Sequence, residues 1–324
     1  MTRVVMMRST GGPEVLAAAE VELPPPGAGE VRIRHSAIGV NFADTYHRTG
    51  LYPMPADCAV PGVEGAGLVE AVGAGVDGVV VGDRVAYAGL PVGGYAEARN
   101  IPAKRLVPLP DDISESTAAA AMLRGLTAHM LLTQVYPVSA GSTVLVHAAA
   151  GGLGLILTQW AKRLGACVIG TVGSYEKAEI ASAMGLDYPV LYRETDFVAE
   201  VRRLTDGAGV DVAFDGIGGD TLLRTLDSVR PFGTVASIGQ ASGSLPDISP
   251  ADLGPRRSIA LARPSVFAYA NDPEFYRVAS RELFRQIASG MRVTVGAEFA
   301  LEEAATAHRM LEAGATTGSI LLRP

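Results

Sequence analysis

Residues 144–156 read VLVHAAAGGLGLI, and this stretch decides the fold of the chain. The short apolar run 144–146 predicts a buried parallel strand, and the small residues 148–154 predict a tight turn. An apolar helix is expected from Leu155 to Leu164. Strand, small-residue turn and helix in this order are typical of the dinucleotide-binding fingerprint G-x-G-x-x-G, with Ala149 in place of the first glycine.

The glycines of this turn allow close approaches that a side chain would block. Gly151 would let the backbone approach a pyrophosphate, and Gly154 would let the helix pack closely on the strand. The free N–H groups at the helix N-terminus would face the phosphate charge. A second predicted strand, 166–172, completes a β-α-β unit in about 30 residues. A glycine-rich loop that merely packs a helix is the alternative, and the flanking elements favour the dinucleotide site.

Length and composition narrow the class of protein. A chain of 324 residues with 48% hydrophobic and 19% charged residues is long enough for two domains with large cores. The net charge is -7 without a basic cluster, which argues against a nucleic-acid partner. The two cysteines, Cys58 and Cys167, allow no disulfide framework. We find no signal peptide and no apolar run near the roughly 20 residues that span a bilayer, so we expect a cytoplasmic protein with no membrane partner.

Residues 1–110 are predicted to be mostly β structure. The segment 30–38 alternates, because Val31 and Ile33 share one face while Arg32 and Arg34 share the other. Glycine and proline separate many short strands, a pattern that is typical of a compact barrel-like β domain. The expected strands are 2–7, 15–21, 30–38, 67–72 and 79–87.

Strands and helices alternate in the second half of the chain. Helical character begins near Ser114, a candidate N-cap, and helices are expected at 117–123 and 125–132. The alternation that follows predicts a parallel, doubly wound sheet. Its expected strands are 144–146, 166–172, 189–192, 210–214, 233–238 and 258–262, with helices at 177–184, 196–204 and 219–229. The tail adds helices at 273–289 and 301–313 and a strand at 320–322.

The segment after the second strand of the β-α-β unit indicates which cofactor binds. An NAD-binding fold usually carries Asp or Glu about 20 residues past the first turn, where it binds the ribose 2′-hydroxyl. Residues 170–174 read GTVGS and contain no acid. Ser174 and Lys177 can donate to a 2′-phosphate, and Tyr192 can add a phenol donor. A solvated Lys177 is the alternative, and the missing acid favours NADP(H).

A series of motifs along nearly the whole chain carries a resemblance to a known family. They are GGPEVL (11–16), GVNFADTY (39–46), GLYP (50–53), GLT (125–127), HAAAGGLG (147–154), QWAK (159–162), GTVG (170–173), ARPS (262–265) and GS (318–319). The chain thereby resembles the quinone oxidoreductase branch of the medium-chain dehydrogenase/reductase superfamily, namely the zinc-free NADPH:quinone reductases related to zeta-crystallin. So long an ordered series is far more specific than the fingerprint alone.

The resemblance implies an α/β fold with two domains. Residues 1–124 and 263–324 would form a GroES-like, β-rich catalytic domain. Residues 125–262 would form a Rossmann domain with a doubly wound parallel sheet that binds NADPH. A homodimer is also implied. Met130 and Gly314 stand where some relatives have a tyrosine and an arginine, so two contacts near the cofactor would differ.

The resemblance also implies which residues bind the cofactor. The segment 42–46 would line the nicotinamide and substrate pocket, and 152–153 would lie on the pyrophosphate. The 2′-phosphate would be held after the second and third strands of the sheet, and two late segments would flank the nicotinamide. The implied set is Asn41, Phe42, Asp44, Thr127, Gly151, Gly152, Leu153, Gly154, Gly173, Ser174, Lys177, Tyr192, Ile238, Gly239, Gln240, Ala241, Pro264, Ser265 and Val266.

The ligands of a catalytic zinc are missing from the expected positions. Zinc alcohol dehydrogenases of this superfamily use a Cys, a His–Glu pair and a second Cys or Asp. Asn41 stands where the first Cys would lie, and Val63 replaces the His before Glu64. A catalytic zinc needs three protein ligands. We therefore expect no metal, since the five histidines show no ligand-like spacing: His35, His47, His129, His147 and His308. His147 opens the fingerprint turn and is placed to form a hydrogen bond there.

Without zinc the expected acceptor is an electron-poor one. No Lewis acid would polarise an alcohol or an unactivated ketone. Quinones and α,β-unsaturated carbonyls fit, because hydride addition gives a delocalised anion that a few donors can stabilise. We expect Asn41, Tyr46 and Tyr52 to be these catalytic donors. Packing beside Pro53 is the alternative role for Tyr52.

The sequence predicts an NADPH:quinone oxidoreductase and leaves two alternatives open. The first is reduction of enones or enoyl thioesters on the same scaffold. The second is a non-catalytic NADPH-binding protein that serves as a structural protein or binds RNA, although the acidic balance disfavours RNA. The physiological acceptor, the source of the proton and the choice between one- and two-electron transfer also stay open.

Overall fold

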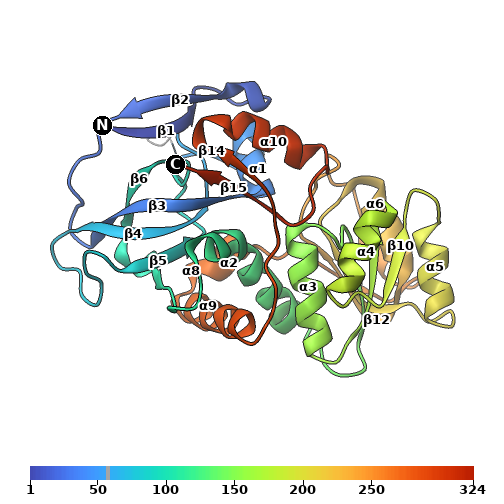
Figure 1. Ribbon diagram of the computed structural model, residues 1–324. Coiled ribbons are helices and arrows are strands. Elements are labelled where there is room, and N and C mark those ends of the chain that lie inside the picture. Colours follow the sequence, from blue (N-terminus) through green and yellow to red (C-terminus); the bar gives the residue numbers. More distant parts are fainter. Residues whose placement is uncertain (56–58) are drawn as a thin grey trace. The chain divides into compact units, whose positions relative to one another are not determined.

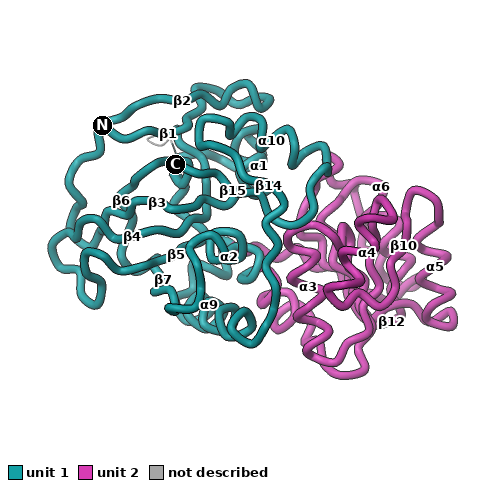
Figure 2. Tube along the Cα trace, viewed as in Figure 1, with its two compact units in different colours: residues 1–126, 267–324 teal, residues 127–266 magenta. Residues whose placement is uncertain are grey.

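The computed structural model describes residues 1–55 and 59–324 (Figure 1). Cys58 lies outside the described residues. The chain divides into two compact units, residues 1–126 with 267–324 and residues 127–266 (Figure 2). Both ends of the chain thus belong to the first unit.

Unit 1 is built on a seven-stranded sheet in the order β14-β15-β3-β4-β5-β7, with β6 also paired to β3. Along β3, Val31 and Ile33 are fully buried whereas Arg34 is exposed, which confirms the predicted alternation. A separate antiparallel hairpin joins β1 (Thr2–Met7) to β2 (Leu16–Val21). The sheet strands are β3 (Glu30–Val40), β4 (Glu64–Val72), β5 (Arg84–Ala88), β6 (Ala98–Pro102), β7 (Val107–Pro108), β14 (Val295–Ala300) and β15 (Ser319–Arg323).

Helices of unit 1 come from both halves of the chain. The last helix ends with Gly314 at C′, where its φ of +60° suits glycine and its N–H donates to the carbonyl of Leu311. The helices are α1 (Phe42–Thr49), α2 (Glu115–Met130), α8 (Val266–Asn271), α9 (Pro273–Ala288) and α10 (Ala304–Glu312), of which α2 continues into unit 2 at Thr127 and α8 begins with the last residue of unit 2.

Unit 2 is a six-stranded parallel sheet in the order β10-β9-β8-β11-β12-β13. The chain starts at β8 in the middle, winds to one edge and then to the other, so the predicted doubly wound sheet is confirmed. The strands are β8 (Thr143–Val146), β9 (Cys167–Val172), β10 (Tyr188–Leu191), β11 (Val210–Asp215), β12 (Val229–Ser237) and β13 (Ala260–Ala262). The helices in the connections between these strands are α3 (Gly152–Arg163), α4 (Tyr175–Ala183), α5 (Phe197–Leu204), α6 (Gly219–Thr225) and α7 (Pro250–Leu253).

Some predicted elements differ from the structure for identifiable reasons. The helices expected at 117–123 and 125–132 are one helix, α2. Gly125 does not end it; a Cβ there would lie 2.5 Å from a Leu283 methyl group, so glycine admits the neighbouring helix α9. The strand expected at 79–87 begins only at Arg84, because Gly82 adopts a φ of +95° in a turn. None of the helices within the described residues is long and apolar enough to cross a membrane.

Candidate active site

The turn between β8 and α3 has the shape of an anion-binding site. Gly151 is the N-cap of α3, and no side chain caps this helix terminus. The first-turn N–H groups of a helix lack intrahelical partners, so they remain available to a ligand. A Cβ on Gly154 would lie 2.4 Å from the carbonyl oxygen of Ala148, whereas one on Gly151 would lie 3.2 Å from it. Gly154 is therefore the position where the close approach of helix and turn requires glycine.

A buried polar network lies beneath this turn. The Nδ1 atom of His147 lies 3.0 Å from the hydroxyl of Thr171, and its Nε2 atom lies 2.9 Å from that of Thr225. The Thr225 hydroxyl donates in turn to the Asp215 carboxylate over 3.0 Å. Burial lowers the pKa of His147, so the ring is neutral. The predicted hydrogen bonding of His147 at the turn is confirmed.

The candidate cofactor residues of unit 2 follow the ends of parallel strands. The segments 151–154, 173–177, Tyr192, 238–241 and 264–266 come after β8, β9, β10, β12 and β13. Because the strands are parallel, these segments meet at one edge of the sheet, where ligands of such folds bind. Thr127 is different, since it lies within α2.

The segments after β9 and β10 meet beside Gly173. The Ser174 hydroxyl caps α4 by accepting the N–H of Lys177 over 3.3 Å. A Cβ on Gly173 would lie 3.4 Å from the Tyr192 hydroxyl and 3.6 Å from Nε of Arg193. The structure thus brings together Ser174, Lys177 and Tyr192, the three residues expected to hold a 2′-phosphate, and adds Arg193. Sequence reasoning missed Arg193, although a guanidinium directly after Tyr192 is a usable signal.

The loop after β12 is anchored from two sides. The N–H of Ile238 donates to the carbonyl of Asp215 over 2.7 Å, and that of Ala241 donates to the carbonyl of Gly216 over 3.2 Å. The guanidinium of Arg263 donates to the carbonyls of Ser237 and Gly239 over 3.1 and 3.3 Å. Since Arg263 directly precedes the segment 264–266, it holds the two segments expected near the nicotinamide close together.

In unit 1, Asn41 is fixed by two buried carboxyl groups. As the N-cap of α1, its backbone N–H donates to Oδ2 of Asp44 over 2.8 Å. Its side-chain amide donates to Oε2 of Glu64 over 2.8 Å. Glu64 is fully buried and also accepts the N–H of Leu123 over 2.6 Å and a guanidinium N–H of Arg124 over 3.3 Å. Burial raises the pKa of Glu64, and Arg124 opposes that shift.

Glu64 and Arg124 belong to the candidate site but were not assigned a role from sequence. Their signal is Gly39, because a Cβ at this position would lie 2.3 Å from Oε2 of Glu64. The motif GVN therefore combines a glycine that admits a carboxylate with the asparagine that binds it. This explanation depends on the pairing of β3 with β4 and is not visible along the chain.

An aromatic cluster adjoins Asn41 on α1. The rings of Phe42 and Tyr46 are 6.3 Å apart between centroids, and those of Tyr46 and Tyr52 are 5.2 Å apart and edge-to-face. Tyr52 also contacts His47 and Phe267, at 5.6 and 6.1 Å. Burial lowers the pKa of His47, so its ring is neutral and adds an aromatic surface. Tyr52 is thus part of a five-ring cluster, and its role as a donor to the acceptor stays a prediction.

Residues 1–55 and 59–324 contain no group of three or more His, Cys, Asp or Glu side chains arranged to hold a metal ion. At the positions expected for zinc ligands, Asn41 forms a hydrogen bond to Glu64, and Val63 is a buried apolar side chain. The absence of a metal cofactor stays a prediction.

Two family models match different parts of the chain. Residues 27–111 match the family described as "Alcohol dehydrogenase GroES-like domain", and residues 152–281 match the one described as "Zinc-binding dehydrogenase". The first falls in unit 1, and the second begins at the first residue of α3. With the sheet of unit 2, these matches confirm the predicted combination of a GroES-like domain and a Rossmann-like domain.

Known proteins resemble the chain over its full length. It is 45% identical to a quinone oxidoreductase of Pseudomonas aeruginosa over 100% of both chains. It is 42% identical to a 2-haloacrylate reductase of a Burkholderia species, covering 100% of this chain and 99% of that one. The crystal structure of the Escherichia coli quinone oxidoreductase complexed with NADPH superposes with a TM-score of 0.96 at 42% identity, covering 99% of this chain and 100% of that chain.

Proposed function

The chain belongs to the quinone oxidoreductase branch of the medium-chain dehydrogenase/reductase superfamily, and from this premise we propose that it reduces quinones with NADPH and without a metal ion. The similarity to quinone oxidoreductases along the entire chain carries this proposal. The protein is an NADP-dependent oxidoreductase. Its fold has an uncapped α3 N-terminus and a cluster of donors beside Gly173, both of which fit the two phosphate-bearing parts of this cofactor.

NADPH supplies the hydride when it is bound. The first-turn N–H groups of α3, from the segment 151–154, would bind the pyrophosphate. Ser174, Lys177, Tyr192 and Arg193 would hold the 2′-phosphate through hydrogen bonds and positive charge. The loop 238–241, which Arg263 anchors, would support the nicotinamide ring together with 264–266.

The side chains of unit 1 would bind and polarise the acceptor. Tyr46 and Tyr52 lie in an aromatic cluster that suits a flat, apolar ring. The amide of Asn41 and the two phenol groups would donate to the acceptor oxygen on which negative charge develops. Glu64 holds the Asn41 amide in one orientation, which removes the cost of reorienting it during the reaction. The reduced acceptor takes its protons from water.

A second candidate function is reduction of an electron-poor carbon–carbon double bond. The full-length similarity to a 2-haloacrylate reductase favours it, because that relative is named for a conjugated alkene acid. Both reactions use the same hydride donor and differ in the shape and charge of the acceptor.

A panel of acceptors tests the proposal. NADPH oxidation would be followed with 1,4-benzoquinone, an enone and 2-chloroacrylate, each with NADPH and NADH and each with and without EDTA. We expect the highest kcat/KM with the quinone and NADPH, unchanged by EDTA. No turnover with any quinone would refute the proposed function. Turnover with the alkenes alone would establish the second candidate, and loss of activity in EDTA would contradict metal independence.

A cytoplasmic homodimer is part of the proposal. The edge strand β13 ends the sheet of unit 2, so one side of its backbone is available to pair with a second copy. Phe232, on the neighbouring strand β12, is 84% exposed and its N–H bonds to Ser258 just before β13. An exposed phenylalanine beside a sheet edge is suited to a subunit interface. We propose a cytoplasmic location because the enzyme needs a supply of NADPH. Cell fractionation tests this location.

A further inference from the structure

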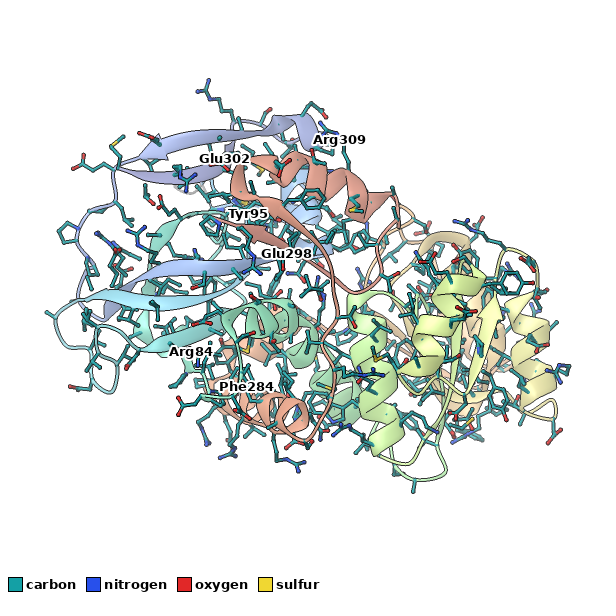
Figure 3. All side chains as sticks on the ribbon, in the orientation of Figure 1. Arg84, Tyr95, Phe284, Glu298, Glu302 and Arg309 are labelled. Carbon is teal, nitrogen blue, oxygen red and sulfur yellow. The ribbon has the colours of Figure 1, made fainter. Side chains whose placement is uncertain are left out.

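A chain of hydrogen bonds crosses unit 1 from the surface of α10 to Asp44. Glu312, whose side chain is 35% exposed, pairs through both carboxylate oxygens with the guanidinium of Arg48, at 2.6 and 3.0 Å. Arg48 is 3.2 Å from Nδ1 of His308, whose Nε2 atom lies 2.8 Å from the Tyr95 hydroxyl. That hydroxyl donates to Oδ2 of Asp44 over 3.1 Å. Figure 3 labels Tyr95, which lies inside the unit near α10.

The chemistry of the partners fixes the direction of every bond in this chain. A guanidinium can only donate, so Nδ1 of His308 accepts from Arg48. The proton of the neutral ring must then be on Nε2, which donates to the oxygen of Tyr95. Burial lowers the pKa of His308 to about 3, so the ring is neutral at physiological pH. The Tyr95 hydroxyl accepts from His308, so its own proton is donated to Asp44.

At the end of the chain, Asp44 is a fully buried carboxyl group with two donors on one oxygen. Its Oδ2 atom accepts the backbone N–H of Asn41 and the hydroxyl of Tyr95. Its Oδ1 atom is buried and has no hydrogen-bond partner in the described part of the chain. The main chain of Asn41 is therefore held by a carboxyl group whose own orientation depends on Tyr95.

We propose that Tyr95, His308 and Arg48 are positioning residues for the reaction, because they hold the carboxyl of Asp44 and, through it, the main chain of Asn41. The inference rests on the proposed function, in which the Asn41 amide contacts the acceptor. It gives the C-terminal helix α10 a defined part in catalysis, although α10 supplies none of the proposed contacts with the acceptor. Loss of a bond anywhere in the chain loosens the N-cap of α1, and a small displacement of a reacting group is costly in rate.

The charge state of Asp44 provides a signature of this arrangement. The pKa of Asp44 is raised to about 7, mainly by burial and to a smaller extent by Glu64 on β4. The bonds from Asn41 and Tyr95 and the charge of Arg124 on α2 oppose this rise. On protonation the proton can occupy the unpartnered Oδ1, so both bonds to Oδ2 persist but lose their charge assistance. Removal of the Tyr95 hydroxyl should therefore raise the pKa of Asp44 and weaken the hold on Asn41.

The decisive variant is Tyr95→Phe, and Tyr87→Phe is its matched control. Both tyrosines are buried to within 1%, and both hydroxyls bond to a histidine ring, since Tyr87 lies 2.9 Å from Nε2 of His35. Only Tyr95 bonds to Asp44. A milder variant is Glu312→Gln, at the exposed end of the hydrogen-bond chain. Its control is Glu298→Gln, which breaks a similar bidentate pair with Arg323 in unit 1.

We expect kcat of Tyr95→Phe with the quinone to fall about tenfold, while KM for NADPH stays within about twofold. The acid limb of the kcat profile should move to higher pH by about one unit. Glu312→Gln should shift kcat in the same direction by a smaller factor. The two control variants should keep the wild-type kcat and profile, and thermal unfolding would show that each variant is folded.

Infrared titration of the protonated carboxyl band, identified by its loss in Asp44→Asn, measures the same group without turnover. An upward shift in Tyr95→Phe but not in Tyr87→Phe, together with the selective fall in kcat, supports the inference. An unchanged titration, or an equal fall in kcat in the two phenylalanine variants, overturns it. If the wild-type enzyme reduces no acceptor, the proposed function fails, whereas the titration still decides whether the chain sets the ionisation of Asp44.

Discussion

Asn41 is a single residue whose hydrogen bonds set the chemistry of the candidate site in unit 1. At a position where zinc enzymes of the superfamily have a thiolate, the amide of Asn41 donates to the buried carboxylate of Glu64. An amide–carboxylate hydrogen bond fixes the orientation of both groups and leaves a second amide N–H for a ligand. In the proposed function this pair would bind an acceptor that is already electron-poor, because a hydrogen-bond donor polarises a carbonyl less than a Lewis acid does.

Lys177→Ala tests whether the side chain of Lys177 binds the 2′-phosphate. We expect the Kd for NADPH to rise about tenfold or more, because a charge-assisted bond to the phosphate is lost, and the Kd for NADH to change less than about twofold. Fluorescence titration with both cofactors measures this. Lys104→Ala, an exposed lysine in unit 1, is the control. Equal losses for both cofactors would remove the 2′-phosphate role from Lys177.

The turn before α3 determines how this helix begins and how closely it packs on the preceding residues. Its helix begins without a side-chain cap, and its glycines differ in the space around them. Only Gly154 is enclosed by backbone, since Ala148 and Ala149 lie within 2.8 Å of where its Cβ would be. The fingerprint is therefore a packing requirement as well as a binding one.

Gly154→Ala should destabilise the protein by about 2 kcal/mol, because the added methyl group overlaps the backbone of the turn. Gly151→Ala should change the free energy of unfolding much less, because its contact would be 3.2 Å and its φ of −76° suits alanine. Urea denaturation of the two variants provides the measurement. Equal stability of the pair would show that the turn has room to relax.

Elements with a strong local pattern were predictable, and elements that depend on distant partners were not. The strand 2–7 and the crossover helices follow apolar periodicity and capping, as when Asp196 accepts the N–H groups of Val198 and Ala199 at the start of α5. In contrast, α1, β6 and β14 were not predicted. These are short segments that are stabilised mainly by neighbours from elsewhere, such as the pairing of β14 with β15.

The whole molecule is assembled from segments far apart in sequence. The C-terminal strand β15 pairs with β3, and the core of unit 1 combines Val5, Ile38, Leu301 and Ile320. Such long-range pairing explains why the two ends of the chain belong to one unit while the parallel sheet of unit 2 is formed by the stretch between them.

The molecular mass in solution tests the proposed dimer. Light scattering should give twice the mass of the chain for the wild type. Phe232→Asp should shift the protein towards monomer, because a charge beside the β13 edge opposes pairing with a second copy. Tyr188→Asp, on the opposite edge strand β10, is the control and should leave the mass unchanged. A wild-type monomer would refute the dimer.

The sequence by itself determined the dinucleotide turn, the alternating elements of the parallel sheet, the missing zinc ligands and the family. These features depend on local requirements, because glycine, capping residues and apolar periodicity constrain the backbone within a few residues. Only the tertiary structure decided that Glu64 and Arg124 meet Asn41, that Arg193 joins Tyr192 beside Gly173, and that Tyr95 and His308 lead to Asp44. Buried polar groups must find partners wherever the packed fold places them, and no local pattern records which distant residue supplies the bond.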